Sequence, residues 1–317
     1  MKILFTGASS FTGYWFVREL AAGGHEVWAT FTGNSADAYD GIRGKRVHEL
    51  GKLCNQIWSC PFGGDNFTDL INQQQEWDVL CHHAADVRDY HSMDFDVGLA
   101  LSTNTNNIRA TLQTLAEKNC NQVVLTGSVF EQQEGAGEQP LRAFSPYGLS
   151  KGLTTEVFRF WCQVMDITLG KFVIPNPFGP FEEPRFTAYL ANTWLKGESA
   201  GVRTPNYIRD NIHVSLLALS YKQFAESLED SPRFQKFNPS GYVESQGSFA
   251  LRFADEMRSR FDLPCELELR VQTDFDEPKM RINTDLLNAE QLGWKEKEAW
   301  DDIASYYLSE KGKDNIL

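Results

Sequence analysis

Tyr147 and Lys151 are the two residues whose types and spacing best suit acid–base chemistry. They stand four positions apart in the segment SPYGLSKG, and a helix would bring both side chains onto one face. An ammonium group beside a phenol favours the phenolate, so it lowers a phenol pKa that is ordinarily about 10. The tyrosine would then exchange a proton with a substrate hydroxyl. A surface tyrosine packed on a lysine stem has the same spacing, so this interpretation depends on the surrounding residues.

Two hydroxyl side chains upstream support the acid–base interpretation. Thr126 and Ser128 lie at the end of the apolar run QVVLTGS, which predicts a strand over residues 122–126. Open α/β sheets bind ligands at the carboxyl ends of their strands. We therefore expect one of these hydroxyls to reach the reacting oxygen, although a hydroxyl at a strand end is otherwise an ordinary turn residue.

The segment TGASSFTG has the composition of a dinucleotide-binding turn. It follows a predicted strand over residues 2–6 and precedes a predicted helix over residues 14–22. Gly7 would allow the tight turn and Gly13 a close helix approach, while N–H groups at the helix start would face a pyrophosphate. Ser10 stands where a middle glycine is usual. The predicted cofactor contacts in this turn are Gly7, Ser10, Phe11, Thr12 and Gly13.

The elements that must position these residues alternate between strand and helix. The pattern predicts further strands over residues 25–30, 78–82 and 167–174. It predicts helices over residues 103–117, 147–165, 189–195, 213–228, 248–260 and 300–309. This alternation favours an α/β protein with a Rossmann-type, doubly wound parallel sheet.

A change in composition places the domain transition. Three prolines and a glycine in NPFGPFEEP predict irregular structure over residues 176–184. We expect residues 1–175 to form the dinucleotide-binding Rossmann domain. Residues 176–317 would form a smaller C-terminal α/β domain that binds the substrate and is interleaved with the first.

Composition and charge exclude several other classes. The net charge of −13 argues against sequence-independent nucleic-acid binding, in which lysine and arginine neutralise phosphates. The six cysteines have no CxxC or other metal-ligand spacing, and His82-His83 lacks further ligands at such spacing, so no metal site is expected. The apolar run over residues 3–5 is too short for a secretory signal, and no stretch approaches the ~18 apolar residues of a membrane span. We expect a cytoplasmic protein with reduced thiols and with neither a nucleic-acid nor a membrane partner.

The order of motifs along almost the whole chain resembles the extended short-chain dehydrogenase/reductase family, which includes nucleotide-sugar epimerases, dehydratases and ketoreductases. The motifs are TGASSFTG, DVLCHHAA, NIRAT, TGSVFE, SPYGLSK, NPFGP, RDNIHV and EPKMRIN. By this resemblance Thr126, Tyr147 and Lys151 are the catalytic residues, and Tyr147 and Lys151 also contact the cofactor. Val129-Phe130 matches the Val-Tyr that follows the family's catalytic serine or threonine.

The same resemblance assigns further residues to ligands. Asn107 matches the helix asparagine that helps to order the active site, although Ala110 replaces the usual glycine. The strand end HHAA would border the cofactor through His83, Ala84 and Ala85. The expected contacts with a nucleotide-diphosphate sugar are Ser128, Asn176, Arg209 and Arg281. A planar guanidinium suits diphosphate oxygens, although surface salt bridges are the common alternative for an arginine.

The predicted cofactor is NAD or NADP, and the sequence favours NADP. NAD-binding Rossmann proteins carry an acidic residue near the end of the second strand. This chain has Phe31 there, followed by Thr32 and Asn34 as the predicted contacts. Uncharged donors tolerate a 2′-phosphate that a carboxylate would repel. No arginine directly follows the strand, so NAD stays open.

The predicted function is that of an NAD(P)-dependent nucleotide-sugar epimerase or 4-ketoreductase. The family's dehydratases carry an Asp-Glu pair where this chain has Gly127 and Ser128, so dehydration is less favoured. The alternative from another class is a non-catalytic, dinucleotide-sensing Rossmann protein, which would not need Thr126, Tyr147 and Lys151 together. The sequence leaves open epimerase versus reductase, the sugar and its nucleotide, and the oligomeric state, for which a homodimer is one option.

Overall fold

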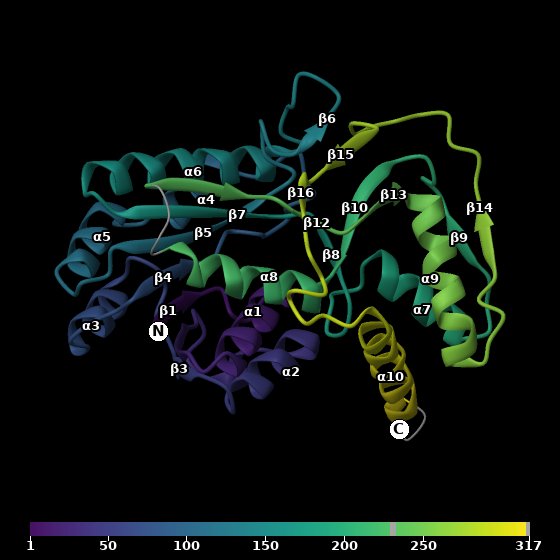
Figure 1. The fold of residues 1–317 in the computed structure, drawn as a ribbon, viewed down its shortest axis with the longest axis horizontal. Coiled ribbons are helices and arrows are strands. Elements are labelled where there is room, and N and C mark those ends of the chain that lie inside the picture. Colours follow the sequence, from purple (N-terminus) through teal and green to yellow (C-terminus); the bar gives the residue numbers. More distant parts are fainter. Residues whose placement is uncertain (229–232, 315–317) are drawn as a thin grey trace. The chain divides into compact units, whose positions relative to one another are not determined.

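The chain divides into two compact units. The computed structural model describes residues 1–228 and 233–314 (Figure 1). The first unit comprises Met1–Glu134, Pro140–Ile174 and Ala218–Pro239, and the second comprises Gly135–Gln139, Pro175–Leu217 and Ser240–Leu317. No helix in the described ranges is long and apolar enough to cross a membrane.

The first unit contains the predicted Rossmann-type sheet, which the structure confirms. Its strands are β1 (Lys2–Thr6), β2 (Glu26–Thr30), β3 (Asn55–Ile57), β4 (Val79–His82), β5 (Gln122–Ser128), β7 (Thr168–Ile174) and β11 (Phe234–Phe237). They pair in parallel in the order β11-β7-β5-β4-β1-β2-β3. The central strands β1 and β4 are almost wholly buried, because helices cover both faces of a doubly wound sheet.

Helices cover the two faces of this sheet (Figure 1). One face carries α1 (Phe11–Ala22), α2 (Gly41–Leu50) and α8 (Val214–Glu226), with the short 3₁₀ helix η1 (Ala36–Ala38) before α2. The other carries α3 (Asp65–Gln73), α4 (Val97–Asn104), α5 (Ile108–Ala116) and α6 (Pro146–Val164). Phe16 of α1 stacks on Tyr221 of α8 at a centroid distance of 4.0 Å, and Phe172 of β7 packs edge-on against both. Aromatic packing therefore joins α1 and α8 to the centre of the sheet.

The helix predicted over residues 103–117 is interrupted in the structure. Helix α4 ends at Asn104 and α5 begins at Ile108, with Asn107 in the left-handed conformation at φ 47°. Asparagine tolerates this conformation because its short side chain can bond locally. Asn107 Nδ2 donates to the carbonyl of Gly63 at 2.7 Å, and an added Cβ on Gly63 would lie 1.9 Å from the Asn106 carbonyl oxygen. Close contact with the loop at Gly63 thus accompanies the break.

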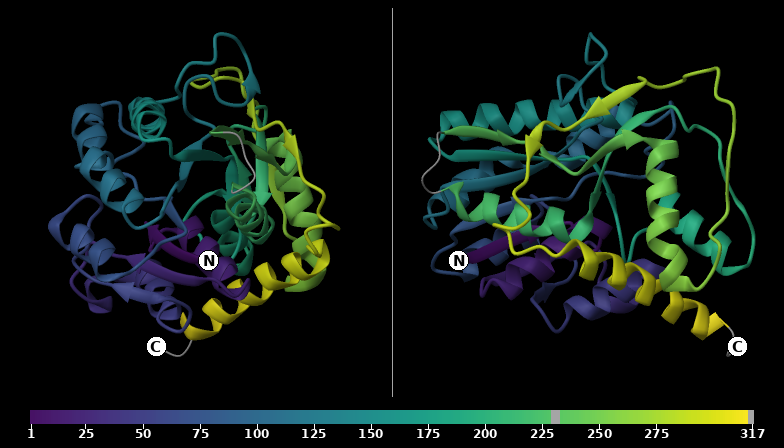
Figure 2. Two further views of the ribbon diagram at one scale, coloured as in Figure 1. Left: turned by 60° about the vertical axis from the view of Figure 1, so that its left-hand side comes forward. Right: turned by 45° about the vertical axis from the view of Figure 1, so that its right-hand side comes forward.

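The second unit contains a smaller, mixed sheet, and Figure 2 gives two further views of its elements. The strands of this sheet are β6 (Ala136–Gly137), β8 (Asn176–Phe178), β10 (Ile208–His213), β13 (Tyr242–Ser245) and β15 (Met280–Ile282). Two separate two-stranded sheets are formed by β9 (Ala200–Val202) with β14 (Leu267–Leu269) and by β12 (Pro239–Ser240) with β16 (Asp285–Leu286). The sheet order is β13-β10-β15-β6, and β8 also pairs with β10. Helices α7 (Phe186–Leu195), α9 (Gln246–Phe261) and α10 (Glu296–Asp314) enclose a core that includes Trp194, Phe253 and Trp300.

Strand β8 corrects the prediction of irregular structure over residues 176–184. Residues Asn176–Phe178 pair in parallel with Asn211–His213 of β10. Pro177 stands opposite Ile212 in this ladder, and β8 pairs with no strand but β10 among the described residues. A proline is tolerated at a sheet edge because its missing N–H faces away from the ladder.

Candidate active site

Tyr147 lies at the start of α6, where the sequence sets the helix boundary. The Ser145 side chain caps the helix by accepting a hydrogen bond from Gly148 N at 3.3 Å, and Pro146 occupies the first turn. The half-buried Tyr147 ring packs edge-on against Tyr90 and Phe95, at centroid distances of 5.6 and 6.0 Å. Capping and ring packing together orient the phenol.

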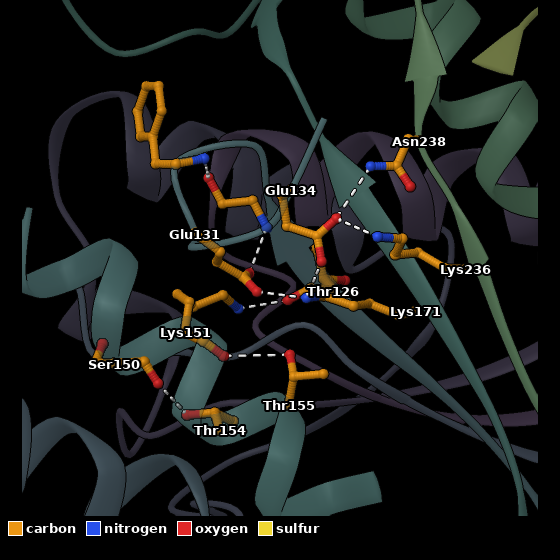
Figure 3. Close-up of polar contacts among 12 residues, drawn as sticks. Thr126, Glu131, Glu134, Ser150, Lys151, Thr154, Thr155, Lys171, Lys236 and Asn238 are labelled. Atoms are coloured by element: carbon orange, nitrogen blue, oxygen red, sulfur yellow. Dashed lines mark hydrogen bonds and ion pairs between the residues drawn. The ribbon is translucent and has the colours of Figure 1, made fainter. Parts of the chain in front are cut away.

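Lys151 follows one turn later and is buried (Figure 3). Its Nζ donates to the carbonyl oxygen of Thr126 at 2.5 Å, which ties α6 to the end of β5. Burial lowers the pKa of Lys151 to about 8, Glu131 opposes this shift and Lys171 adds to it. The side chain is therefore mainly an ammonium at neutral pH, and it loses its proton at a pH only slightly above neutral.

The two candidate hydroxyls at the end of β5 differ in their contacts. Thr126 is 3% exposed, and its Oγ1 lies 3.0 Å from His83 Nδ1. Ser128 is half-buried, and its Oγ accepts a hydrogen bond from Phe130 N at 3.2 Å. The Thr126 hydroxyl is thus part of an internal network, whereas that of Ser128 is the more accessible.

The glycine-bearing turn has the close approaches that a dinucleotide loop needs. Gly7 has φ 81°, and an added Cβ there would lie 2.6 Å from Ala84 N. A Cβ on Gly13 would lie 2.3 Å from the Gly7 carbonyl oxygen. Ser10 caps α1, since its Oγ accepts a hydrogen bond from Gly13 N and donates to Gly7 O. The first-turn N–H groups of Phe11 and Thr12 have no partner within a helix and suit an anion.

His83 connects this turn to β5. Its Nε2 lies 2.9 Å from Ser10 Oγ and 3.1 Å from Thr12 Oγ1, while Nδ1 faces Thr126. Desolvation, Lys151 and His82 lower the pKa of His83 to about 3, so its imidazole is neutral. The residues that follow it, Ala84 and Ala85, continue beside the turn, where Ala84 N donates to Thr6 Oγ1.

His82 and Asn104 form a buried contact that the sequence interpretation missed. His82 Nδ1 lies 3.0 Å from Thr6 Oγ1, and its Nε2 lies 3.2 Å from the Asn104 carbonyl oxygen. Asn104 Oδ1 accepts from Asp86 N at 2.8 Å, and its Nδ2 donates to Thr154 Oγ1 of α6. Asn104 therefore joins β4, α4 and α6, whereas the predicted Asn107 bonds to a loop. Ala100 and Asn104 form a buried i,i+4 pair, a spacing that could have identified it.

The region after β2 carries a cation close to the turn. Phe31 is buried, whereas Thr32 and Asn34 are exposed. Arg43 of α2 donates from Nε and Nη2 to Ser9 Oγ, at 3.0 and 2.8 Å, and its guanidinium lies 4.8 Å from the Tyr39 ring centroid. An arginine therefore reaches the dinucleotide turn from a helix that the sequence interpretation did not predict.

The residues expected to bind the sugar nucleotide in the second unit are tied into its sheet. Asn176 Nδ2 donates to the Asp210 carbonyl at 3.2 Å. The Arg209 guanidinium donates to three backbone carbonyls and to the carboxylate of Glu277 at 2.8 Å. Arg281 is fully buried and pairs with Arg209 in the β10–β15 register. In the described ranges, no group of three or more His, Cys, Asp or Glu side chains is placed to hold a metal ion.

Comparisons with known proteins agree with this architecture. Among solved structures, Pal from Bacillus thuringiensis superposes with a TM-score of 0.74 at 18% identity, covering 98% of this chain and 99% of that one. The UDP-glucose 4-epimerase of Thermotoga maritima superposes with a TM-score of 0.72 at 16% identity, covering 98% of this chain and 99% of that one. The dTDP-glucose 4,6-dehydratase DesIV of Streptomyces venezuelae, solved with NAD bound, superposes with a TM-score of 0.68 at 16% identity, covering 98% of each chain. These identities establish the fold alone.

Sequence comparison identifies the family. A search of curated proteins finds no significant match. The model of the NAD dependent epimerase/dehydratase family, however, matches residues 3–238. This range includes the dinucleotide turn, β5 and the Tyr147–Lys151 helix. The chain therefore belongs to the NAD-dependent epimerase/dehydratase family.

Proposed function

We propose that this chain is an enzyme that acts at a hydroxyl-bearing carbon of a nucleotide-diphosphate sugar, as an epimerase or a 4-ketoreductase. The observation that carries the proposal is the buried ammonium of Lys151, which is fixed on the Thr126 carbonyl one helical turn beyond Tyr147. In this role Tyr147 exchanges a proton with the sugar hydroxyl, and the charge of Lys151 stabilises its phenolate. Thr126 or Ser128 would donate a hydrogen bond to the reacting oxygen.

The cofactor would occupy the glycine-bearing turn of the first unit. Gly7 and Gly13 fit this role because a side chain at either position would collide with backbone. The other proposed contacts are Ser10, Phe11, Thr12, Thr32, Asn34, His83, Ala84, Ala85, Asn107, Tyr147 and Lys151. When bound, the nicotinamide supplies the hydride chemistry. The protein's part is to hold the reactants and move the proton.

The end of β5 supports epimerisation or reduction over dehydration. Gly127 and Ser128 replace the acidic pair of the dehydratases. The space beside Gly127 is filled, since an added Cβ would lie 2.6 Å from Lys171 Cε and 3.0 Å from Glu131 Oε1. Several of the matched structures are described as UDP-sugar epimerases, which supports a nucleotide-sugar substrate. Asn176, Arg209 and Arg281 are its proposed contacts in the second unit.

Within this NAD-dependent family, we propose that the present chain accepts NADP through Arg43. The guanidinium already lies on Ser9 of the dinucleotide turn, and its planar donors suit a phosphate. Calorimetric titration of Arg43→Ala with NAD and NADP tests this, with Lys45→Ala of the same helix as control. We expect Arg43→Ala alone to lose at least about tenfold in NADP affinity while NAD affinity holds. If the wild type, Arg43→Ala and Lys45→Ala each bind NAD and NADP with equal affinity, Arg43 does not recognise the 2′-phosphate and the proposal is refuted.

Tyr147→Phe tests the proposed chemistry. The change keeps the ring and removes the exchangeable proton, so single-turnover hydride transfer should fall by about 10² to 10⁴-fold with cofactor affinity kept. Tyr189→Phe on the exposed side of α7 is the matched control and should keep the wild-type rate. Nicotinamide absorbance, with a panel of UDP- and dTDP-sugars, gives the readout. Undiminished transfer in Tyr147→Phe refutes this mechanism, and dinucleotide binding without turnover of any sugar favours the sensing protein.

A further inference from the structure

A chain of alternating charges lies beside Lys151 in the first unit (Figure 3). Lys171 Nζ contacts Glu131 Oε2 at 2.5 Å and Glu134 Oε1 at 2.6 Å. Glu134 Oε2 in turn contacts Lys236 Nζ at 3.0 Å and accepts from Asn238 Nδ2 at 3.1 Å. Glu131, Glu134 and Lys171 are buried, whereas the Lys236 side chain is 38% exposed. The four charged residues form what we call the buried charge chain.

The pairing keeps Glu134 and Lys171 ionised despite their burial. Burial alone would raise the pKa of Glu134, yet Lys171 and Lys236 hold it below its ordinary value. Burial would lower the pKa of Lys171, yet Glu131 and Glu134 raise it above its ordinary value. A buried ion pair of this kind persists only where each charge has its partner. The buried charge chain is therefore a fixed arrangement of charges around neutral pH.

Gly127 makes room for this arrangement. Lys171 lies on β7 opposite Leu125 of β5, and Gly127 lies two residues further along β5, opposite Val173. An added Cβ on Gly127 would lie 2.6 Å from Lys171 Cε. A lysine end normally swings aside at little cost, but here two carboxylates hold its Nζ. The absent side chain at position 127 is thus a condition for the Lys171 pair.

The buried charge chain is connected to Lys151 through the end of β5. Glu131 Oε1 accepts from Ser128 N at 2.6 Å, two residues beyond the Thr126 carbonyl that receives Lys151. The Glu131 carboxylate attracts the Lys151 ammonium, and Lys171 repels it. Lys151 also acts on His82, the last residue of β4, and on His83, which follows it, but both imidazoles are neutral because their pKa values fall to about 3. Among the described residues, Glu131 and Lys171 are the charged groups that shift the pKa of Lys151.

We propose that Glu131 is a positioning residue, which holds the charged ammonium of Lys151 against the end of β5 while Lys171 and the Ser128 N–H fix its carboxylate. The effect of Glu131 on proton transfer by Tyr147 rests on the proposed function. Lys151 then keeps its proton over the pH range in which Tyr147 works, and the opposing charges of Glu131 and Lys171 set the upper end of that range. Neither charge needs to touch the substrate.

The test is the pH dependence of dinucleotide binding by the apo-protein, measured by calorimetry from pH 6 to 10 with NAD and NADP. Binding that uses the Lys151 ammonium weakens above the pKa of this lysine. Glu131→Gln should move that alkaline limb down by about one pH unit, because it removes an attracting charge. Lys171→Met should move the limb up, because it removes a repelling one. Glu182→Gln, a buried glutamate of the second unit, is the matched control and should leave it unchanged.

The opposite shifts distinguish electrostatic positioning from loss of structure, which would move both variants in one direction. The proposal is overturned if the alkaline limbs of Glu131→Gln and Lys171→Met stay at the wild-type pH, or if both shift in the same direction. The double variant Glu131→Gln/Lys171→Met keeps the test decisive if a single variant does not fold, because it leaves neither charge of that pair buried alone. Because Glu131 acts on Lys151 more strongly than Lys171 does, the limb of the double variant should lie below that of wild type, and an unshifted or raised limb contradicts the proposal. These binding measurements need no turnover, so they stand even if Tyr147→Phe refutes the proposed function.

Discussion

Two buried glutamates, one in each unit, have pKa values that are shifted in opposite directions. Glu134 of the first unit is 4% exposed and Glu182 of the second is 3% exposed. Lysines hold the pKa of Glu134 below its ordinary value. Glu182 instead accepts hydrogen bonds from the hydroxyls of Thr187 and Tyr307, and burial raises its pKa to about 7. The comparison teaches that the nearest cation, rather than the depth of burial, decides whether a carboxyl group stays ionised here.

The largest effect should come from removing the cation. Lys171→Met leaves Glu131 and Glu134 without their buried partner, and breaking a buried pair in this way costs about 3–5 kcal/mol in the free energy of unfolding. Urea denaturation at pH 7 measures this loss. Lys236→Met removes a partly exposed cation from the same glutamate and should cost about 1 kcal/mol or less. Similar costs for the two variants would contradict the central position of Lys171.

An intermediate effect should appear in the pH dependence of stability, with opposite signs at the two glutamates. Glu134, whose pKa is lowered on folding, contributes stability that is present above about pH 4.5 and is lost as the pH falls below it. Glu182, whose pKa is raised, contributes stability at low pH that is lost as the pH rises from about 4.5 to 7. Since one pKa unit corresponds to about 1.36 kcal/mol, this second loss is about 3 kcal/mol.

Glu182→Gln measures that second loss, because glutamine keeps the shape and does not titrate. The variant's stability relative to wild type should rise between pH 5 and pH 8 in urea titrations. Glu134→Gln should show the reverse, with its largest deficit at neutral pH. Parallel pH curves for wild type and Glu182→Gln would mean that Glu182 is ionised like Glu134.

The smallest effect should come from one hydroxyl that contacts Glu182. Tyr307→Phe removes the donor that contacts Glu182 Oε1 at 2.9 Å, and a hydrogen bond to a neutral group contributes about 1 kcal/mol. At pH 5 we expect a loss of that size, which should grow towards pH 8 as Glu182 ionises and the bond becomes charge-assisted. Thermal unfolding at the two pH values gives the comparison. A loss independent of pH would contradict the titration of Glu182.

Local features of the fold were predictable from the sequence because they depend on neighbouring residues. Strand β1 covers the predicted residues 2–6, and Tyr147 and Lys151 share α6 as their spacing requires. The break at Asn107 was not predicted, since it depends on contact with Gly63, 44 residues away. Helix α2 was missed because Gly41 and Gly44 weaken its helical pattern.

The buried charge chain could not be predicted for a similar reason. Lys171 pairs with Glu131 across 40 positions, and only the β5–β7 register brings them together. A lysine inside the apolar run TLGKFVI was the one local sign. The roles of Thr126, Tyr147 and the second-unit arginines stay predictions, because they concern substrate contacts rather than the fold.

The contact between Gly127 and Lys171 also restricts the order in which this protein can evolve. A side chain gained at position 127 would collide with a lysine that two glutamates hold in place. A lineage that replaced Lys171 first would leave the carboxylates of Glu131 and Glu134 buried without this cation. The viable order of substitutions therefore begins with the loss of one of these two carboxylates. Substitutions at positions 127, 131 and 171 should therefore be epistatic and should co-vary among descendants of this sequence. An acidic residue at position 127, as in the dehydratases, should be found only in descendants that have already lost Lys171.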